Sequence, residues 1–278
     1  MKEARKIEGS EEDGSISLNK YISSTGICSR READEIIKAG RVRIDGAVAI
    51  SGNRVFEGQK VTIDHKPIQQ RPPAHYIAFH KPVGIVCTTD PKEPKNIIDY
   101  IKYPERLFPI GRLDKDSEGL ILLTNDGDIV NKILRAGNDH EKEYIVTVDR
   151  PIDQRFADKM AKGVPILGTV TKPCRVQLMG DRKFKIILVQ GLNRQIRRMC
   201  SFFGVEVVRL ERIRIMDIRL EGIAVGKWRA LFPKELKNLE SKLINAQKTA
   251  QSNFSKETKR SPSQKTHSKS SSKGKKSR

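Results

Sequence analysis

Residues 111–120 read Gly-Arg-Leu-Asp-Lys-Asp-Ser-Glu-Gly-Leu and run directly into an apolar stretch at 120–123. The segment places the carboxylate of Asp114 in a turn that is bounded by glycines, which readily adopt turn conformations. A second segment, residues 191–199, reads Gly-Leu-Asn-Arg-Gln-Ile-Arg-Arg-Met. The i, i+3, i+4 spacing of its arginines places them together on one face of a helix. An acidic loop and a basic helical face together favour chemistry on a substrate that carries phosphate.

The second segment predicts an amphipathic helix that begins near Asn193. The arginines Arg194, Arg197 and Arg198 are expected to face away from the core. Because a glycine turn that leads into a helix N-terminus is a natural anion site, this end of the helix is a candidate for binding a phosphate or carboxylate. The apolar stripe on the opposite face consists of Ile196, Met199, Cys200 and Phe203.

Composition indicates the class of protein and the class of its partner. The chain has 278 residues, of which 37% are hydrophobic and 32% charged, as in a soluble globular protein. Its formal charge is +20, and residues 241–278 contribute +10 of it through eleven lysines and arginines and one acid. The other 43 basic and 33 acidic residues leave the folded part at +10 as well, which favours nucleic acid as the partner.

Neither a membrane segment nor a bound metal or cofactor is expected. No apolar run approaches the ~18 residues of a membrane span and no signal-type stretch is seen, so we expect a cytoplasmic protein without membrane contact. The four cysteines are scattered without a Cys-x-x-Cys pair, which argues against a zinc site or a disulfide framework and favours reduced, partly buried thiols. The chain has no Gly-x-Gly-x-x-Gly motif and no P-loop.

The pattern along the chain predicts an α+β protein in five segments. Glycine and serine in the first segment, proline in the third, and serine and lysine in the last are typical of segments without a packed core. The expected segments are a disordered leader at 1–16, a small α+β unit at 17–66, a linker at 67–75, a mixed α+β domain at 76–239 and a basic disordered tail at 240–278.

The small unit carries clear local signals. Ser29 and Glu32 form a capping box that opens a helix predicted to end at Gly40, and a shorter helix before it is predicted to end at Gly26. Asp45-Gly46 is typical of a hairpin turn between two strands. The basic side chains that lie off the apolar stripe are Arg30, Arg31, Lys38, Arg41 and Arg43.

These residues resemble a known RNA-binding module. Gly26-Ile27-Cys28-Ser29-Arg30-Arg31-Glu32-Ala33-Asp34, followed by Gly40-x-Val42-x-Ile44-Asp45-Gly46, is similar to the alpha-L RNA-binding motif of a ribosomal small-subunit protein and several RNA-modifying enzymes. The resemblance implies that the five basic side chains named above bind RNA. The alternative is a charged helix face that only meets solvent.

The larger domain alternates strand-like runs with a few short helices, which predicts a mixed sheet. Residues 125–127, Asn-Asp-Gly, are predicted to form a turn, and residues 234–247 to form a helix. The runs that read as strands are 76–79, 120–123, 144–148 and 184–189.

Three motifs in this domain resemble those of pseudouridine synthases of the RsuA family. They are Gly111-Arg112-Leu113-Asp114-x-x-Ser117-x-Gly119-Leu120, Lys142-Glu143-Tyr144, and Gly191-x-Asn193-Arg194-Gln195-Ile196-Arg197-Arg198-Met199. The resemblance covers residues 17–233 and implies an alpha-L RNA-binding module followed by a mixed-sheet catalytic domain. Residues 136–144 and Leu192 are more similar to the RluF subgroup, which acts on large-subunit ribosomal RNA. Leu192 departs from the broader family, where arginine or lysine is usual.

The resemblance implies a role for each motif residue. Asp114 is the essential carboxylate and acts as a nucleophile or as a base at the sugar. Tyr144 stacks on the flipped uridine near its C5 atom. A buried carboxylate needs a cation to stay ionised, and Arg197 is the expected partner, with Arg198 second. Arg112, Arg194 and Arg198 are expected to contact RNA, and Arg112 to fill the space that the base leaves. The reaction needs no cofactor.

Three alternatives remain open at this point. The enzyme is expected to be a monomer that acts on large-subunit ribosomal RNA. Small-subunit ribosomal RNA and a transfer RNA anticodon loop are two alternative substrates. A different class of protein, a non-catalytic RNA-binding factor in ribosome assembly, would bind through residues 17–66 and the tail. In that case Asp114 and Tyr144 would be dispensable.

Overall fold

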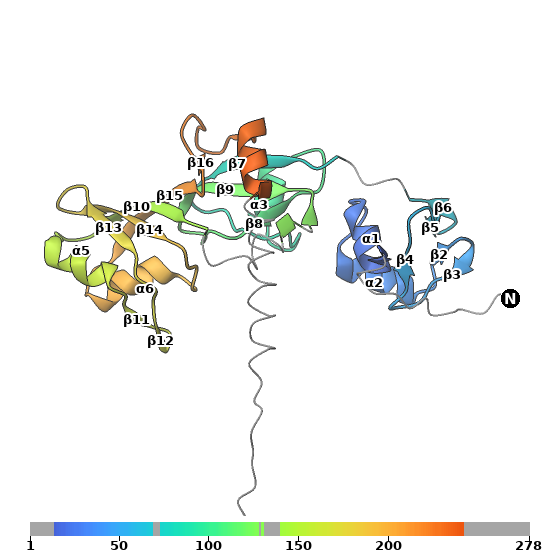
Figure 1. The fold of residues 1–278 in the computed structure, drawn as a ribbon, viewed down its shortest axis with the longest axis horizontal. Helices are drawn as coiled ribbons and strands as arrows, with labels where there is room; N and C mark the ends of the chain where they lie inside the picture. Colours follow the sequence, from blue (N-terminus) through green and yellow to red (C-terminus); the bar gives the residue numbers. More distant parts are fainter. Residues whose placement is uncertain (1–13, 69–72, 128, 131–139, 242–278) are drawn as a thin grey trace, which may run out of the picture.

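The computed structural model describes residues 14–68, 73–127, 129–130 and 140–241, which form a small α+β module and a larger domain built on one mixed sheet (Figure 1). The predicted fold class is therefore confirmed. The expected disordered leader lies outside the described residues up to residue 13, but its expected end at residue 16 is wrong, because Ile16 pairs with Val55 in a strand. The expected tail lies outside the described residues from residue 242 onward, but its expected start at residue 240 is wrong, because residues 240 and 241 are helical.

The module packs two helices on a small sheet. The capping box at Ser29 is present, since its Oγ accepts from the Glu32 backbone and its own N–H donates to the Glu32 carboxylate. Asp45 and Gly46 both have positive φ, 48° and 83°, as the predicted hairpin requires. The elements are β1 (Ile16–Ser17), α1 (Leu18–Ser24), α2 (Arg30–Lys38), β2 (Val42–Ile44), β3 (Ala47–Val48), β4 (Arg54–Val55), β5 (Val61–Ile63) and β6 (Lys66–Pro67).

The module extends slightly beyond its expected end. β6 pairs with β5, and the N–H of Ile68 donates to the carbonyl oxygen of Val61. Residues 67 and 68 therefore belong to the small sheet rather than to the linker. The local sequence hides this because proline at position 67 suits an edge strand as well as it suits a linker.

The larger domain has a nine-stranded sheet whose two halves meet along one parallel pair. Its order is β13-β14-β10-β15-β9-β7-β17, with β16 on β15 and β8 on β9. β15 and β9 run parallel, and the other pairs are antiparallel. The strands are β7 (Tyr76–Lys81), β8 (Phe108–Ile110), β9 (Glu118–Thr124), β10 (Lys142–Val148), β13 (Arg175–Leu178), β14 (Lys183–Leu188), β15 (Val207–Ile215), β16 (Ile218–Arg219) and β17 (Trp228–Ala230), beside the hairpin β11 (Pro165–Ile166) and β12 (Thr169–Val170).

Helices cover parts of this sheet. α3 (Ile97–Ile101) packs against β7 and β9. α5 (Gln154–Ala161) and α6 (Gln195–Phe202) pack against β10 and β14 (Figure 1). Residues 233–241 are helical, which confirms the helix predicted at 234–247 within the described range. In this part of the chain no helix combines the length and the apolar character needed to cross a bilayer.

The turn predicted at residues 125–127 is wrong, because a helix begins there. Residues 127, 129 and 130 are helical, and Asp126 Oδ1 accepts from the Ile129 N–H at 3.4 Å. An aspartate in this position can cap a helix as well as form a turn. The local sequence therefore did not distinguish the two.

Three apolar cores hold the domain together. β7 and β9 are buried on both faces: Phe79 and Ile121 pack on one side, while Ala78 and Leu122 pack on the other. The third core lies between the other half of the sheet and the helices α5 and α6, around Phe184 and Met199. The two halves thus have separate cores and are joined through the β9–β15 pair.

Gly119 permits this junction. It lies opposite Arg212 in the parallel register and has φ +107°. A Cβ at this position would lie 2.3 Å from the carbonyl oxygen and 2.5 Å from the nitrogen of Arg212. Because the obstacle is backbone, only glycine allows β9 to approach β15 this closely.

Candidate active site

A cavity of about 580 Å³ opens at the junction of the two half-sheets. It is lined by the loop after β8, by β10 and β15, and by the loop that precedes α6. Four of the predicted site residues line it: Arg112, Asp114, Tyr144 and Arg194. Segments far apart in the sequence therefore converge on one site.

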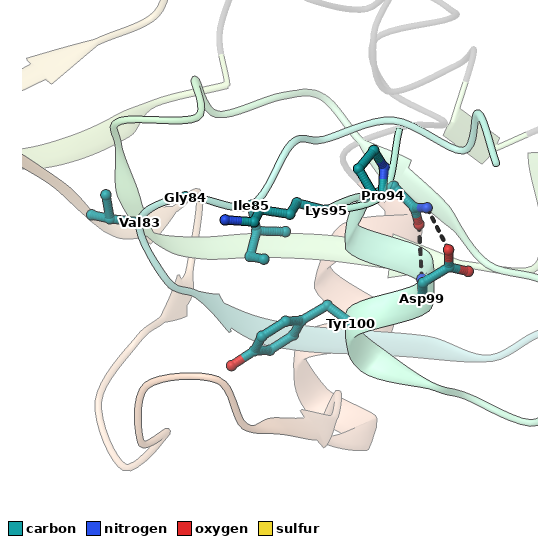
Figure 2. Close-up of a pocket in the computed structure, with 8 residues that line it drawn as sticks. Val83, Gly84, Ile85, Pro94, Lys95, Asp99 and Tyr100 are labelled. Carbon is teal, nitrogen blue, oxygen red and sulfur yellow. Dashed lines mark hydrogen bonds between the residues drawn. The ribbon is translucent and has the colours of Figure 1, made fainter. Parts of the chain in front are cut away.

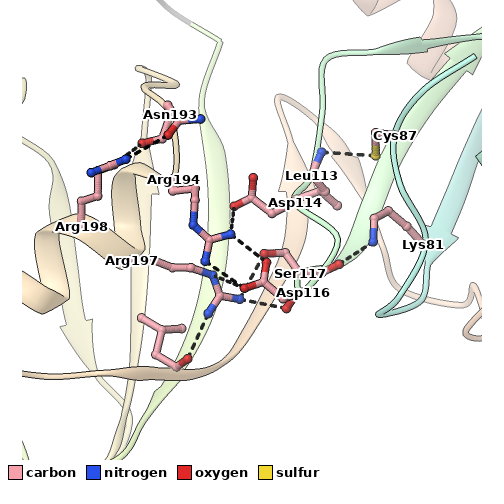
Figure 3. A network of polar contacts seen from close by, with 11 residues as sticks. Lys81, Cys87, Leu113, Asp114, Asp116, Ser117, Asn193, Arg194, Arg197 and Arg198 are labelled. Carbon is pink, nitrogen blue, oxygen red and sulfur yellow. Dashed lines mark hydrogen bonds and ion pairs between the residues drawn. The ribbon is translucent and has the colours of Figure 1, made fainter. Parts of the chain in front are cut away.

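A buried lysine forms hydrogen bonds that anchor the loop carrying Asp114. Lys81, at the end of β7, is fully buried, and its Nζ donates to the carbonyl oxygens of Ser117 at 2.7 Å and Pro82 at 2.8 Å (Figure 3). Burial lowers the pKa of Lys81. The N–H of Gly84 donates to the carbonyl oxygen of Lys115 at 2.7 Å, and the N–H of Leu113 donates to Cys87 Sγ at 3.4 Å. The position of Asp114 is thus set by residues near 81–87, which lie outside the three sequence motifs.

We expect Lys81→Met to lower the free energy of unfolding by about 1–3 kcal/mol, because it leaves a buried carbonyl oxygen without a donor. Urea denaturation of the full chain measures the change. Lys115→Met is the matched control, since Lys115 is an exposed lysine of the same loop; its effect should stay within about 0.5 kcal/mol. Equal losses in the two variants would contradict the anchoring role of Lys81.

Acidic and basic side chains form a network beside the cavity (Figure 3). Arg194 donates to both carboxylate oxygens of Asp116, at 3.1 and 2.9 Å, and its Nη1 lies 3.6 Å from Asp114 Oδ2. Arg197 Nε lies 3.4 Å from Asp116 Oδ2. The hydrogen bonds from Arg194 and the charge of Arg197 hold the pKa of Asp116 below its usual value although burial opposes them.

The expected pairing of Arg197 with Asp114 is therefore corrected. Arg194 forms the ion pair with Asp114, and Arg197 instead donates to the carbonyl oxygens of Asp116 at 2.8 Å and Val207 at 3.0 Å. The physical reason is that the acidic loop presents the carboxylate and carbonyl of Asp116 to the helix, and these accept from the largely buried Arg197 side chain.

The expectation of three arginines on one helical face is also wrong. α6 begins at Gln195, and Arg194 precedes it with a left-handed backbone, φ 48°. Arg198 is exposed and folds back on Asn193, donating to its carbonyl oxygen at 3.1 Å. The predicted apolar stripe is confirmed for Ile196, Met199 and Cys200, which are buried, and Phe203 packs against the same core.

Arg212 is a cavity residue that the sequence did not reveal. It is 3% exposed, and its Nε donates to the carbonyl oxygen of Leu120 at 2.7 Å while Nη1 donates to that of Arg112 at 3.3 Å. It lies opposite Tyr144 across the β10–β15 pair, with its Cζ 6.0 Å from the Tyr144 ring centre. The alternation of side chains along a strand could have predicted its burial, because residues two positions apart lie on the same face and Arg212 shares that face with the apolar Leu210.

The basic residues of the module lie on its surface and do not line the cavity. Arg30, Arg31, Lys38 and Arg41 are exposed, and Arg43 is half-buried and donates to the carbonyl oxygen of Gly46 at 3.1 Å. Lys38 and Arg41 form ion pairs with acids of the module, Glu35 and Asp64 respectively. The charges of these two residues are thus partly compensated before any RNA binds.

A smaller cavity of about 290 Å³ lies between the turn at 83–85 and α3 (Figure 2). Asn96, which lines it, caps α3, since its side-chain oxygen accepts from the Asp99 N–H at 2.8 Å. None of the predicted site residues lines this cavity. Within the described ranges, no cluster of three His, Cys, Asp or Glu side chains could hold a metal ion.

Comparisons with known proteins give consistent matches. Residues 75–202 match the family described as RNA pseudouridylate synthase, and residues 17–55 match the S4 domain. The chain is 58% identical over 229 residues to the dual-specificity RNA pseudouridine synthase RluF of Salmonella typhi, covering 82% of this chain and 79% of that protein. It is 33% identical to the ribosomal large subunit pseudouridine synthase B of Bacillus subtilis, covering 81% of this chain and 95% of that protein. A crystal structure of a pseudouridylate synthase matches with a TM-score of 0.59 and 28% identity, over 81% of this chain and all of that one.

Proposed function

The chain belongs to the RNA pseudouridine synthases, as its motifs predicted, and we propose that it isomerises a uridine of large-subunit ribosomal RNA with Asp114 as the essential carboxylate. One observation carries this assignment of the site. Asp114 and Tyr144 belong to different motifs and lie thirty positions apart in the sequence, yet they line the same cavity at the junction of the two half-sheets. A protein that only binds RNA needs no such convergence.

The chemistry assigned to the cavity follows from the reaction. Uridine is bonded to ribose through N1, and the product is bonded through C5, so the base must leave C1′, rotate and reattach. The reacting atoms lie inside the stacked RNA, and flipping the nucleotide out costs about a few kcal/mol. We assign to Asp114 the attack on the sugar or the removal of a sugar proton. Tyr144 then stacks on the flipped base near C5, where a proton is lost.

Arginines at the opening of the cavity suit the RNA backbone. Arg112 and Arg194 line the cavity and are exposed, and Arg198 is exposed on α6 nearby. Guanidinium groups bind phosphates in bidentate fashion. Arg197 then positions the Asp116 loop. The basic side chains of the S4 domain that contact RNA are Arg30, Arg31, Lys38, Arg41 and Arg43.

The names of the relatives bear on the range of substrates. Two relatives, at 58% and 56% identity, are named dual-specificity enzymes, and the 33% identical relative is named for the large ribosomal subunit. These names support ribosomal RNA as one substrate and a second RNA as another, for which we propose a transfer RNA anticodon loop. We further propose that the enzyme acts as a monomer in the cytoplasm.

Tritium release tests the proposed function. The wild-type protein is mixed with unmodified large-subunit RNA, small-subunit RNA or transfer RNA, each carrying [5-³H]uridine. We expect release from large-subunit RNA and from transfer RNA, because the C5 hydrogen leaves as a proton when C5 bonds to the sugar. RNA that binds without any release would contradict catalysis and favour the RNA-binding alternative. Release from small-subunit RNA alone would contradict the proposed substrate.

We expect deletion of residues 241–278 to flatten the salt dependence of RNA binding. This segment carries +10, and each phosphate that it neutralises contributes about 0.7–0.9 to the slope of log K against log salt. Filter binding at several salt concentrations measures the slope. The matched control replaces the tail lysines and arginines with serine at constant length, and should behave like the deletion. An unchanged slope in both would show that the tail does not touch RNA.

A further inference from the structure

Arg212 has a hydrogen-bond donor that has no acceptor among the residues the structure describes. Arg212 is one of the residues that line the large cavity, and its Nε and Nη1 each donate to a backbone carbonyl oxygen. Nη2 is buried and has no partner among the described residues. A buried donor without an acceptor destabilises a folded protein, so its presence here points to an acceptor that arrives with a ligand.

The depth of Arg212 restricts what that acceptor can be. The arginines at the opening, Arg112 and Arg194, are exposed, whereas Arg212 is 3% exposed. A phosphate of an RNA chain is bonded to sugars on both sides and must stay at the opening. Only a flipped base with its sugar can reach the floor, and the acceptors of uracil are its two carbonyl oxygens, O2 and O4.

The neighbours of Arg212 suit a planar ring. Tyr144 is its direct partner across the two strands, so both side chains leave the sheet on the same face. Lys142, two residues before Tyr144 on β10, also lines the cavity. Burial, with the positive charge of Arg212 added, lowers the pKa of Lys142, as expected for a poorly hydrated floor.

We propose that Arg212 Nη2 donates to the uracil carbonyl oxygen next to the atom that is bonded to ribose. This inference rests on the proposed function. When the N1–C1′ bond breaks, its electron pair stays on the base, and the negative charge spreads over N1, O2 and O4. C5 then bonds to C1′, the C5 hydrogen leaves as a proton, and N1 takes up a proton. A donor at the carbonyl oxygen stabilises the charge that develops in the first step.

The same N–H donor of Arg212 can bind a carbonyl oxygen of the base in both the substrate and the product. Rotation of uracil about the axis through N3 and C6 exchanges N1 with C5 and O2 with O4. The carbonyl oxygen that faces Arg212 is therefore O2 in the substrate and O4 in the product. The base can turn over while the protein group that stabilises it stays in place.

The test compares two substrates in one variant. Arg212→Lys keeps the positive charge but removes the planar guanidinium group, whose separate N–H donors bind the carbonyl oxygens of Leu120 and Arg112 and, as proposed, the ligand. A hairpin RNA carries the mapped target as uridine or as 5-fluorouridine, and loss of the N1-linked nucleoside from nuclease digests is followed by mass spectrometry. Relative to wild type, we expect a loss of about 10²–10³-fold with uridine. With 5-fluorouridine the loss should be below about tenfold, since fluorine already stabilises the negative charge of the leaving base.

The results distinguish a failure of the Arg212 contact from a failure of the proposed pseudouridine synthase activity. Equal losses on the two substrates, or full activity of Arg212→Lys, would overturn it, because a purely structural role cannot depend on the acidity of the base. If wild type itself leaves every RNA unchanged, the proposed function fails instead. Thermal unfolding and RNA affinity of the variant are measured alongside.

A second measurement uses wild type alone and applies even if Arg212→Lys does not fold. Hairpins that carry pyrimidin-4-one riboside, which lacks O2, or pyrimidin-2-one riboside, which lacks O4, compete with the uridine hairpin. We expect the hairpin that lacks O2 to compete at least about tenfold less well than the hairpin that lacks O4. Equal competition would overturn the contact.

Discussion

Asp114→Asn should abolish tritium release from [5-³H]uridine RNA while leaving RNA affinity within about threefold, a change under ~1 kcal/mol. An amide of the same size cannot attack the sugar or take its proton. We expect the rate to fall by at least about 10⁴-fold, as when a group that acts directly in bond breaking is removed. The ion pair with Arg194 is long, 3.6 Å, and the Asp114 side chain is 35% exposed, so its loss should disturb the fold little.

Asp90→Asn is the matched control for this variant. Asp90 is an exposed carboxylate outside the cavity lining, and its substitution changes the net charge by the same amount. It should release tritium at the wild-type rate. Measurable turnover by Asp114→Asn at more than a hundredth of that rate would remove Asp114 from the chemistry.

Gly119→Ala should lower the free energy of unfolding by more than about 3 kcal/mol, among the largest effects of any single substitution in this chain. The new Cβ would lie 2.3 Å from the Arg212 carbonyl oxygen, and the φ of +107° is strained for any residue other than glycine. The β9–β15 pair would have to separate, and the two half-sheets would lose their connection. Urea denaturation followed by circular dichroism measures the loss.

Gly127→Ala tests whether this loss is specific to the junction. Gly127 has no heavy atom within 4 Å of an added Cβ and no left-handed backbone. Its substitution should change stability by less than about 1 kcal/mol. If Gly119→Ala unfolded at the same urea concentration as Gly127→Ala, the close approach of the two strands would not limit stability.

Local patterns were sufficient for most secondary structure. The capping box at Ser29, the hairpin at Asp45-Gly46 and the apolar stripe of α6 each depend on residues within a few positions of one another, and each is present. The predictions failed where one local pattern fits two structures. Asp126 can start a helix or a turn, and proline at position 67 suits a linker or an edge strand.

The candidate site was only partly predictable. The motifs placed Asp114, Tyr144, Arg112 and Arg194 in one site, and they share one cavity. The roles of these residues stay predictions until the variants are measured. The pairing of Arg197 with Asp114 was taken from the motif resemblance, which does not fix side-chain contacts. Arg194 and Arg197 instead bind Asp116, on a loop about eighty positions earlier in the sequence.

The sequence by itself determined the α+β class, the RNA-binding module, the family and the loop that carries Asp114, because these depend on local patterns and short motifs. Only the tertiary structure decided that Lys81 holds this loop, that Arg194 pairs with Asp114, and that Arg212 lies on the floor of the cavity. The physical reason is the β9–β15 pair, which joins strands about ninety residues apart. Such pairing is stabilised by packing and by backbone hydrogen bonds across the whole domain, and no short segment of the chain encodes it.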